Sequence, residues 1–194
     1  MPRLIPPVVK SGSMAESVQP ELSSTPGLLL RPWRTNDAAT AVLAFTDPDI
    51  QRWHFRRIDD LDEARTWIES THVGWTAESS ANWAVVEAGA EEPVGRVGLT
   101  KVDLASGWGE VSYWVLAAAR GRDLATQAVM TLASWAFEAL GLHRLEIEHS
   151  VDNPASCRVA TRAGFAAEAT LRSALLHDDG WHDMHLHAKV RDDA

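Results

Sequence analysis

Two periodicities alternate along this chain, and each change between them marks the boundary of an expected element. Short apolar runs without helical spacing predict strands, whereas apolar positions that recur every three or four residues predict helices. The expected strands cover residues 28–33, 83–87, 93–102, 108–116 and 145–150, followed by a hairpin over 170–190. The expected helices lie near residues 37–45, 59–68, 124–140 and 154–163. This order predicts an α+β fold in which helices cover both faces of one mixed, mostly antiparallel sheet of six to seven strands.

The N-terminal segment differs from the rest because it is rich in Pro and Ser and shows no periodicity. Such a composition buries little apolar surface, so we expect residues 1–26 to form a disordered or loosely attached leader. Residues 27–194 are then expected to form a single domain with one buried core.

One turn joins the expected strand over 108–116 to the longest expected helix. It reads R-G-R-D over residues 120–123, and the helix that begins near Leu124 is apolar except for one narrow polar stripe. The first amides of a helix lack intrahelical partners, and the helix dipole adds partial positive charge there. A basic, glycine-containing turn before such a helix therefore predicts a site for a phosphate group.

Net charge and cysteine content narrow the range of partners. The formal net charge of −9 disfavours nucleic-acid binding and suits a cationic partner such as an amine. The single cysteine, Cys157, excludes an internal disulfide and favours a reducing compartment. No run of about 18 apolar residues predicts a membrane span, and the N-terminus lacks the apolar core of a signal peptide. We therefore expect a cytoplasmic protein without a membrane or nucleic-acid partner.

Two segments, in this order, resemble the signature motifs of the GNAT superfamily of N-acetyltransferases. Residues 119–128, A-R-G-R-D-L-A-T-Q-A, are similar to its acyl-CoA pyrophosphate loop. Residues 152–165, D-N-P-A-S-C-R-V-A-T-R-A-G-F, are similar to its second signature, N-x-x-S-x-x-V with a closing Gly-Phe. Shorter matches at L-L-L-R-P-W, T-D-P-D and D-G-W-H-D resemble the branch that includes the bacterial ribosomal-protein alanine N-acetyltransferases. The resemblance covers about residues 28–192.

The resemblance implies that acetyl-CoA is the cosubstrate and that no metal takes part. The diphosphate would lie on the backbone amides of the basic loop, with charge added by Arg120 and Arg122, and the pantetheine arm would lie where two strands part, one over 111–116 and one over 145–150. Ser156 would protonate the leaving CoA thiolate. The CoA-binding residues implied in this way are Trp114, Val115, Leu116, Arg120, Gly121, Arg122, Asp123, Leu124, Ala125, Thr126, Asn153 and Ser156.

Three positions depart from the family pattern. Asp123 stands where the loop usually has glycine, and its carboxylate favours the helix but repels a diphosphate. Leu175 stands where the ribosomal-protein branch has a catalytic glutamate. Tyr113, the only tyrosine, does not clearly match the superfamily's usual acid.

The general base must therefore come from another position. Glu148 is the first candidate, because some family members carry a catalytic glutamate five residues before the motif's asparagine. Glu110, one strand over, is the second candidate. Each of the two could equally be a solvated or salt-bridged surface carboxylate. Strand alternation places His149 on the opposite face from Glu148, so the two cannot both face the cleft.

Histidines near the C-terminus raise the question of a metal. The expected hairpin carries His177, His182, His185 and His187 with Asp178 and Asp183. Imidazole and carboxylate groups bind zinc in proteins, but a hairpin that lines the acceptor pocket fits the resemblance better. Cys157 is disfavoured as a nucleophile, because direct acyl transfer needs no covalent intermediate. The loop over residues 53–57 either lines the acceptor pocket or merely packs.

These observations predict an enzyme, an acyl-CoA-dependent N-acyltransferase that moves an acetyl group to a primary amine by direct attack in a ternary complex. The amine is either a protein N-terminus or a small molecule. Two alternatives stay open, a non-catalytic acyl-CoA-binding or sensing module and an acyltransferase with a bulkier donor such as succinyl-CoA. A nucleotide-binding phosphotransferase is disfavoured because the chain lacks the G-x-x-x-x-G-K-[ST] pattern. Pairing of two chains into a homodimer is left open.

Overall fold

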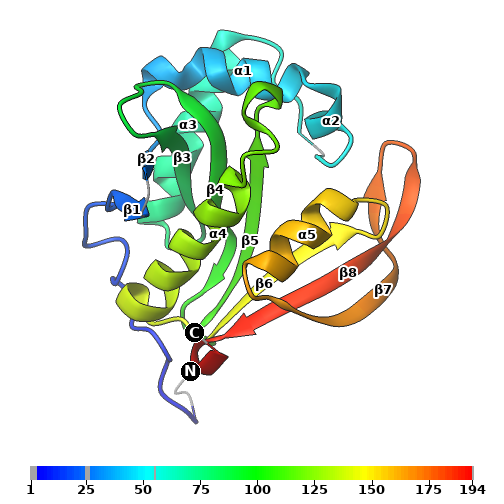
Figure 1. Cartoon of the computed structure of the whole chain (residues 1–194). Helices are drawn as coiled ribbons and strands as arrows, with labels where there is room; N and C mark the ends of the chain where they lie inside the picture. Colours follow the sequence, from blue (N-terminus) through cyan, green and yellow to red (C-terminus); the bar gives the residue numbers. More distant parts are fainter. Residues whose placement is uncertain (1–3, 25–26, 55, 194) are drawn as a thin grey trace.

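The computed structural model describes residues 4–24, 27–54 and 56–193 of the chain. Its centre is a sheet of eight strands in the order β1-β2-β3-β4-β5-β6-β8-β7 (Figure 1). The strands are β1 (Leu22–Ser24), β2 (Leu28–Pro32), β3 (Ala81–Glu87), β4 (Pro93–Asp103), β5 (Trp108–Val115), β6 (Arg144–Ser150), β7 (Ala166–His177) and β8 (Gly180–Val190). The helices are α1 (Ala38–Thr46), α2 (Pro48–Gln51), α3 (Leu61–Thr76), α4 (Leu124–Trp135) and α5 (Pro154–Arg162), and the π-helical turn η3 (Ala136–Leu140) extends α4. Short 3-10 turns are η1 (Thr35–Asp37), η2 (Ala117–Ala119) and η4 (Arg191–Asp193).

The sheet is antiparallel at every junction except the one between β5 and β6. There, three consecutive residues of β5, ending at Glu110, pair in parallel with three of β6, ending at Glu146. Beyond these residues the two strands diverge, as Figure 1 shows. The parting of strands expected from the sequence is therefore present, and it divides the sheet into two halves.

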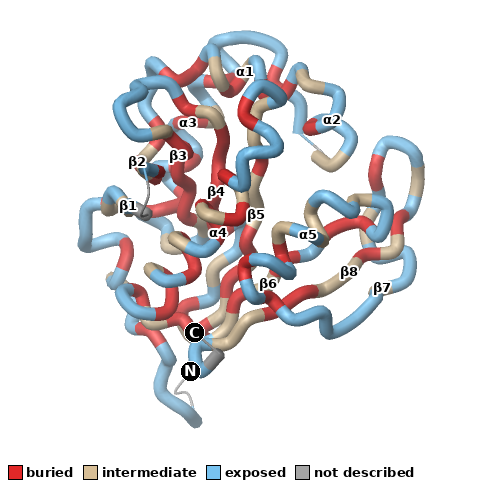
Figure 2. Tube along the Cα trace, viewed as in Figure 1, coloured by how far each residue is buried: buried red, intermediate tan, exposed pale blue. Residues whose placement is uncertain are grey.

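Helices cover both faces of the sheet, which confirms the predicted α+β fold. Successive residues of β3 alternate between two cores: Trp83 and Val85 pack with α4, whereas Ala84 and Val86 pack with α1 and α3. Figure 2 shows the resulting buried centre of the sheet. The sheet has eight strands instead of the expected six to seven, because β1 pairs along β2 at the sheet edge.

Local caps set two of the helix boundaries. The side chain of Asp60 accepts hydrogen bonds from the amides of Asp62 and Glu63, both at 2.9 Å, and so begins α3. Gly141 ends the α4 segment with a φ of 90°, a left-handed conformation that suits glycine. Among the described residues, no helix combines the length and the apolar character needed to cross a membrane.

The expectation of a loosely attached leader is wrong for residues 8–24. The amides of Val8 and Val9 donate hydrogen bonds to the turn after β4, at 3.1 and 2.9 Å. The carboxylate of Glu78 accepts from the amides of Gly12 and Met14, both at 2.8 Å. Met14 is 0% exposed within the core beneath α4. The segment lacks periodicity because it packs as an irregular strap rather than as a helix or a long strand.

Met14→Ala is expected to lower the free energy of unfolding by about 2–5 kcal/mol, the usual cost of truncating a fully buried methionine. Leu4→Ala is the matched control, because Leu4 precedes the strap and is fully exposed. Urea denaturation followed by tryptophan fluorescence measures both variants. If Met14→Ala and Leu4→Ala unfold at the same denaturant concentration as the parent chain, the strap does not contribute to the core.

Candidate functional site

The parting of β5 and β6 opens two cavities that meet between the strands. The first, here the loop cavity, has a volume of about 620 Å³ and lies against the turn that precedes α4. The second, here the sheet cavity, has a volume of about 670 Å³ and lies over β4, β5 and β6. The residues that line both are Trp53, His54, Tyr113, Trp114, Asn153 and Ser156. Two ligands could therefore meet at this junction, each entering from its own cavity.

The turn before α4 presents backbone amides to the loop cavity. The first amide with an intrahelical partner is that of Gln127, which donates to the carbonyl of Asp123 at 3.1 Å. Gly121 and Asp123 both have left-handed backbone conformations, with φ of 76° and 59°. These two residues direct the chain into α4 and leave the first backbone amides of the helix without intrahelical partners. Such amides bind phosphate.

The two arginines of this turn are occupied by carboxylates of the protein. Arg120 bonds to Asp47 at 2.6 Å and to Asp49 at 2.7 Å, and Arg122 forms an ion pair with Glu87. The sequence led us to expect both guanidinium groups at the diphosphate. In the structure Arg120 lines the loop cavity and also fastens α2 to the loop, whereas Arg122 does not line the cavity.

Two further cations, both from α5, line the loop cavity beside Arg120. Arg158 and Arg162 lie four residues apart, so they project from one face of the helix toward the cavity. Arg162 reaches the carboxylate of Asp123 at 3.2 Å, and Thr126 donates to the same oxygen at 2.7 Å. Sequence reasoning missed both arginines, although their i, i+4 spacing beside the second motif was visible.

Ser156 lies at the junction of the cavities, at the start of α5. The side chain of Asn153 accepts a hydrogen bond from the amide of Ser156 at 3.0 Å, which fixes the first turn of the helix. The hydroxyl groups of Ser156 and Tyr113 lie 2.7 Å apart, and that of Tyr113 also donates to the Ser156 carbonyl at 3.2 Å. Burial raises the pKa of Tyr113 to about 12, so its phenol stays protonated. Tyr113, which lacked a motif match, is thus brought to the site by the sheet.

Both carboxylates expected as bases line the sheet cavity. Glu110 accepts from Lys101 at 2.6 Å and from Thr100 at 3.0 Å, so its charge is already balanced. Desolvation raises the pKa of Glu148, and repulsion from Glu110 adds to this effect. A carboxylate with a raised pKa takes up a proton more readily, so Glu148 is the better placed base. Leu175 also lines the cavity, at the position where a glutamate was expected from the resemblance.

A buried cation lies in the same cavity. Arg96 is 7% exposed and donates to Asn82 at 2.9 Å and to Ser112 at 2.8 Å. Burial lowers the pKa of Arg96 to about 10, and the charge of Arg56 adds to this effect. Within the described ranges, no carboxylate lies at ion-pair distance from Arg96. Because buried charges are normally paired, this guanidinium is suited to an anionic group on a bound molecule.

The hairpin histidines separate into two groups. His177 and His182 lie against Trp53, with ring centroids 5.9 and 6.2 Å away, and His182 is held by Asp179 at 2.7 Å. His185 and His187 lie farther along β8, toward α5. The four hairpin histidines, whose grouping around a metal the sequence disfavoured, therefore do not form one cluster. In the loop over 53–57, Trp53 and His54 line both cavities, and Phe55 lies outside the described residues.

Two expected cofactor-binding residues are absent from the lining of the loop cavity, Leu116 and Arg122. The amide of Leu116 donates to the carbonyl of Val94 at 2.9 Å, so it is not free to pair with a ligand. The expected residues that do line the loop cavity are Trp114, Val115, Arg120, Gly121, Asp123, Leu124, Ala125, Thr126, Asn153 and Ser156.

Comparison with known proteins finds similarity to acetyltransferases in a family model, in related sequences and in solved structures. Residues 27–166 match the family model described as "Acetyltransferase (GNAT) domain". The uncharacterised N-acetyltransferase YoaA of Bacillus subtilis is 21% identical over 168 residues, which cover 86% of this chain and 95% of that protein. The ribosomal-protein-serine acetyltransferase of Escherichia coli is 29% identical over 102 residues, 53% of this chain and 57% of that protein. The structure of Mycobacterium smegmatis RimJ in complex with CoA-disulfide has a TM-score of 0.79 at 23% identity, covering 90% of this chain and 87% of that chain, and shows the same fold.

The pKa of His54 predicts how the free energy of unfolding depends on pH. Burial, followed by the charges of Arg96 and His177, lowers the pKa of His54 from 6.5 to about 4. The unfolded chain therefore binds this proton more readily, and stability is lost as pH falls from 6.5 toward 4, by about 3 kcal/mol at most.

We expect the loss of unfolding free energy between about pH 7 and about pH 4.5 to be smaller in His54→Phe than in the parent chain. His72→Gln serves as control, because His72 is exposed. Denaturant titrations at the two pH values give both differences. A loss in His54→Phe equal to that of the parent chain would contradict a partly buried imidazole that stays neutral.

Proposed function

Because the chain belongs to the GNAT acetyltransferase family, we propose that it transfers an acetyl group from acetyl-CoA to a primary amine by direct attack in a ternary complex. The meeting of two cavities at Ser156 and Tyr113, where β5 and β6 part, carries the proposal. One cavity ends at unpaired helix amides, and the other holds carboxylates. A thioester and an amine can therefore be held in contact without a covalent enzyme intermediate.

The loop cavity is the proposed donor site. The diphosphate of acetyl-CoA would accept hydrogen bonds from the first amides of α4, and the dipole of this helix favours its charge. Arg158 and Arg162 would contribute positive charge from α5. The pantetheine arm would then pass between β5 and β6, past Asn153, toward Ser156.

The sheet cavity is the proposed acceptor site. A primary amine is protonated near neutral pH and must lose a proton before it attacks. Glu148 would take this proton, directly or through a water molecule, and its raised pKa suits the task. Glu110 is the weaker candidate because Lys101 neutralises it.

The proposed acyl transfer proceeds in one addition and one elimination. The amine nitrogen bonds to the thioester carbonyl carbon, and the C–S bond then breaks to release CoA as the thiolate. Ser156 would donate its hydroxyl hydrogen to this sulfur, and the neutral phenol of Tyr113 would hold the serine hydroxyl in place. Glu148 would take the first proton, which the ammonium group loses before attack. The second proton, lost from the nitrogen after it bonds to carbon, would return to the Ser156 oxygen through solvent and restore the hydroxyl.

The position of Arg96 narrows the proposed acceptor. The guanidinium is buried in the sheet cavity and bonds only to neutral groups among the described residues. An acceptor with an anionic group, such as a carboxylate or phosphate, would pair with it while its amine lies toward Glu148. We therefore propose an amine that also carries an acidic group, either on a protein N-terminal segment or on a small molecule.

A non-catalytic acyl-CoA-binding module is the second candidate. Asp123 in the loop and Leu175 in the sheet cavity favour it, because each replaces a residue that the active pattern uses. Transfer from a donor bulkier than acetyl-CoA, such as succinyl-CoA, is the remaining alternative. Measuring the release of CoA thiol with acetyl-CoA and with succinyl-CoA distinguishes an acetyltransferase, an acyltransferase with a bulkier donor and a non-catalytic binding module. The cytoplasmic location and the homodimer stay predictions.

Incubation with acetyl-CoA and a panel of amines, each offered as the free acid and as the amide, tests the proposal through release of CoA thiol. We expect turnover with at least one amine and faster turnover of the acid form. Glu148→Gln should lower kcat/KM by about 10²–10⁴-fold, the usual effect of removing a general base. Ser156→Ala should lower kcat with little change in the binding of CoA.

Glu138→Gln is the matched control, because Glu138 is an exposed carboxylate on the far end of the α4 segment. It should retain parental activity. Tight CoA binding without thiol release on any amine would favour the binding module. Full activity in Glu148→Gln would instead move the base to another residue.

The carboxylate of Asp123 is expected to weaken the binding of CoA. This carboxylate would repel the diphosphate and would compete with it for the positive charge of Arg162. Asp123→Gly should therefore tighten CoA binding, and Asp123→Asn should give part of this gain because it removes the charge alone. Titration calorimetry with CoA measures both variants. Weaker binding in Asp123→Asn would show that the carboxylate positions Arg162 for the ligand rather than opposing it.

A further inference from the structure

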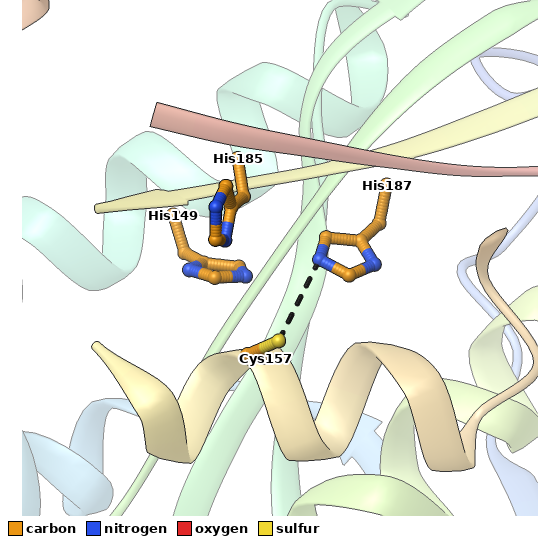
Figure 3. Close-up of side chains that lie close together, drawn as sticks. All are labelled: His149, Cys157, His185 and His187. Carbon is orange, nitrogen blue, oxygen red and sulfur yellow. Dashed lines mark hydrogen bonds between the residues drawn. The ribbon is translucent and has the colours of Figure 1, made fainter. Parts of the chain in front are cut away.

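A second group of reactive side chains lies between α5 and the sheet. Figure 3 shows His149 from β6, His185 and His187 from β8, and Cys157 from α5. His149 and His185 are directly opposite in the antiparallel register of β6 and β8, and His187 follows two residues later on the same face. Cys157 points toward them from the helix. One ligand atom from each of the four lies within 4.8 Å of those of the others.

The hydrogen bonds of two imidazoles fix which nitrogen faces the cluster. His149 is 4% exposed, and its Nδ1 bonds to the carbonyl of Ser150 at 2.8 Å. His187 is 2% exposed, and its Nδ1 faces the carbonyl of Phe165 at 3.5 Å. A carbonyl only accepts, so Nδ1 carries the hydrogen in each ring and Nε2 carries the lone pair.

The lone pair of His149 has no partner in the part of the chain that the structure describes. Its Nε2 is buried and forms no hydrogen bond. A buried acceptor left unpaired costs about 1–3 kcal/mol, so proteins rarely leave one. Stacking against His187, with ring centroids 5.1 Å apart, packs the ring but does not satisfy this nitrogen. A metal ion would satisfy it.

The distances and the surroundings fit a tetrahedral ion. The Sγ of Cys157 lies 3.9 Å from Nε2 of His187. Zinc–sulfur and zinc–nitrogen bonds of ordinary length would place two such atoms about 3.5 Å apart. Metal-binding histidines usually donate their second nitrogen to a carbonyl or carboxylate, as His149 does here. Three imidazoles and one thiolate select zinc or a similar transition metal over magnesium or calcium.

We propose that His149, Cys157, His185 and His187 form a four-coordinate site for a divalent transition metal, with zinc as the best match. On binding, the thiol of Cys157 loses its proton to solvent and its sulfur bonds to the ion, with no change of oxidation state. The resemblance led us to expect no metal, and the metal that was weighed and disfavoured involved the hairpin histidines with Asp178 and Asp183. His149 and Cys157, which complete the set, come from two other elements.

A bound ion would join α5 to β6 and β8. The first turn of α5 holds Asn153 and Ser156 at the junction of the two cavities, and Cys157 is the next residue. The metal would therefore fix the helix that carries Ser156 without touching the reacting atoms. This inference does not depend on acetyl transfer, since metal binding is measured directly.

Cobalt titration of the metal-free full chain tests the site. Cobalt bound by three nitrogens and one thiolate absorbs strongly in the visible region and shows a thiolate-to-cobalt charge-transfer band. Cys157 is the only cysteine of the chain, so this band can arise at no other residue. We expect one equivalent of cobalt to produce both features and zinc to displace it.

The variants His149→Ala and Cys157→Ser should each weaken cobalt binding by more than 10-fold, and Cys157→Ser should abolish the charge-transfer band. His72→Asn and His143→Asn are matched controls, because both histidines are exposed and outside the cluster. They should bind as the parent chain does. Binding that is absent, or that is undiminished in both cluster variants, would overturn the proposal.

A second measurement covers the case in which a cluster variant folds poorly. In the parent chain, zinc should slow modification of the Cys157 thiol by a disulfide reagent, and the exposed-histidine controls should show the same protection. Equal rates with and without zinc in a folded parent chain would rule out coordination by Cys157, whatever the variants do.

Discussion

The rest of this structure depends on one interruption of backbone pairing. β5 and β6 are the only parallel neighbours in the described sheet, and their pairing stops at Glu110 and Glu146. Continued pairing would bury the peptide groups of both strands against each other and close the sheet. Because they part, the chain leaves polar backbone groups beside a cleft, where a ligand or water must satisfy them. The two cavities, and the meeting of Ser156 with Tyr113, follow from this gap.

Helix α5 connects the site to the other half of the sheet. Its first turn is fixed by Asn153, which places Ser156 in the cleft. The next residue, Cys157, turns toward the histidines of β6 and β8. If the helix were rotated by one residue, Ser156 would no longer face the cleft and Cys157 would no longer face the histidines. The cap at Asn153 therefore determines the direction of both side chains. The cleft and any ion bound beneath the helix would therefore both be attached to α5.

The arginines of the loop over residues 120–123 pair with carboxylates of the protein, although a basic loop suggests cations free to bind an anion. Arg120 and Arg122 neutralise carboxylates of α2 and β3 and so stabilise the loop. In the proposed donor site, an anion would be bound by backbone amides and by Arg158 and Arg162, which lie on a helix from the opposite half of the sheet. A donor bound there would contact both halves, so binding would bridge the gap between the strands. In the other cavity, Arg96 supplies a buried charge that a bound acid can neutralise.

Local sequence determined the elements and the motif positions. Asn153 and Gly141 begin and end helices next to the expected ranges over 154–163 and 124–140, because capping acts within a few residues. The order of elements and the two motifs also determined the fold class and the junction at Ser156. Tertiary structure alone decided the attachment of the N-terminal strap, the pairing of Arg120, and the approach of Tyr113 to Ser156. It also assembled His149, Cys157 and His187, which lie on three elements. These contacts join residues far apart in the chain, and no local propensity carries information about which distant side chain will be near.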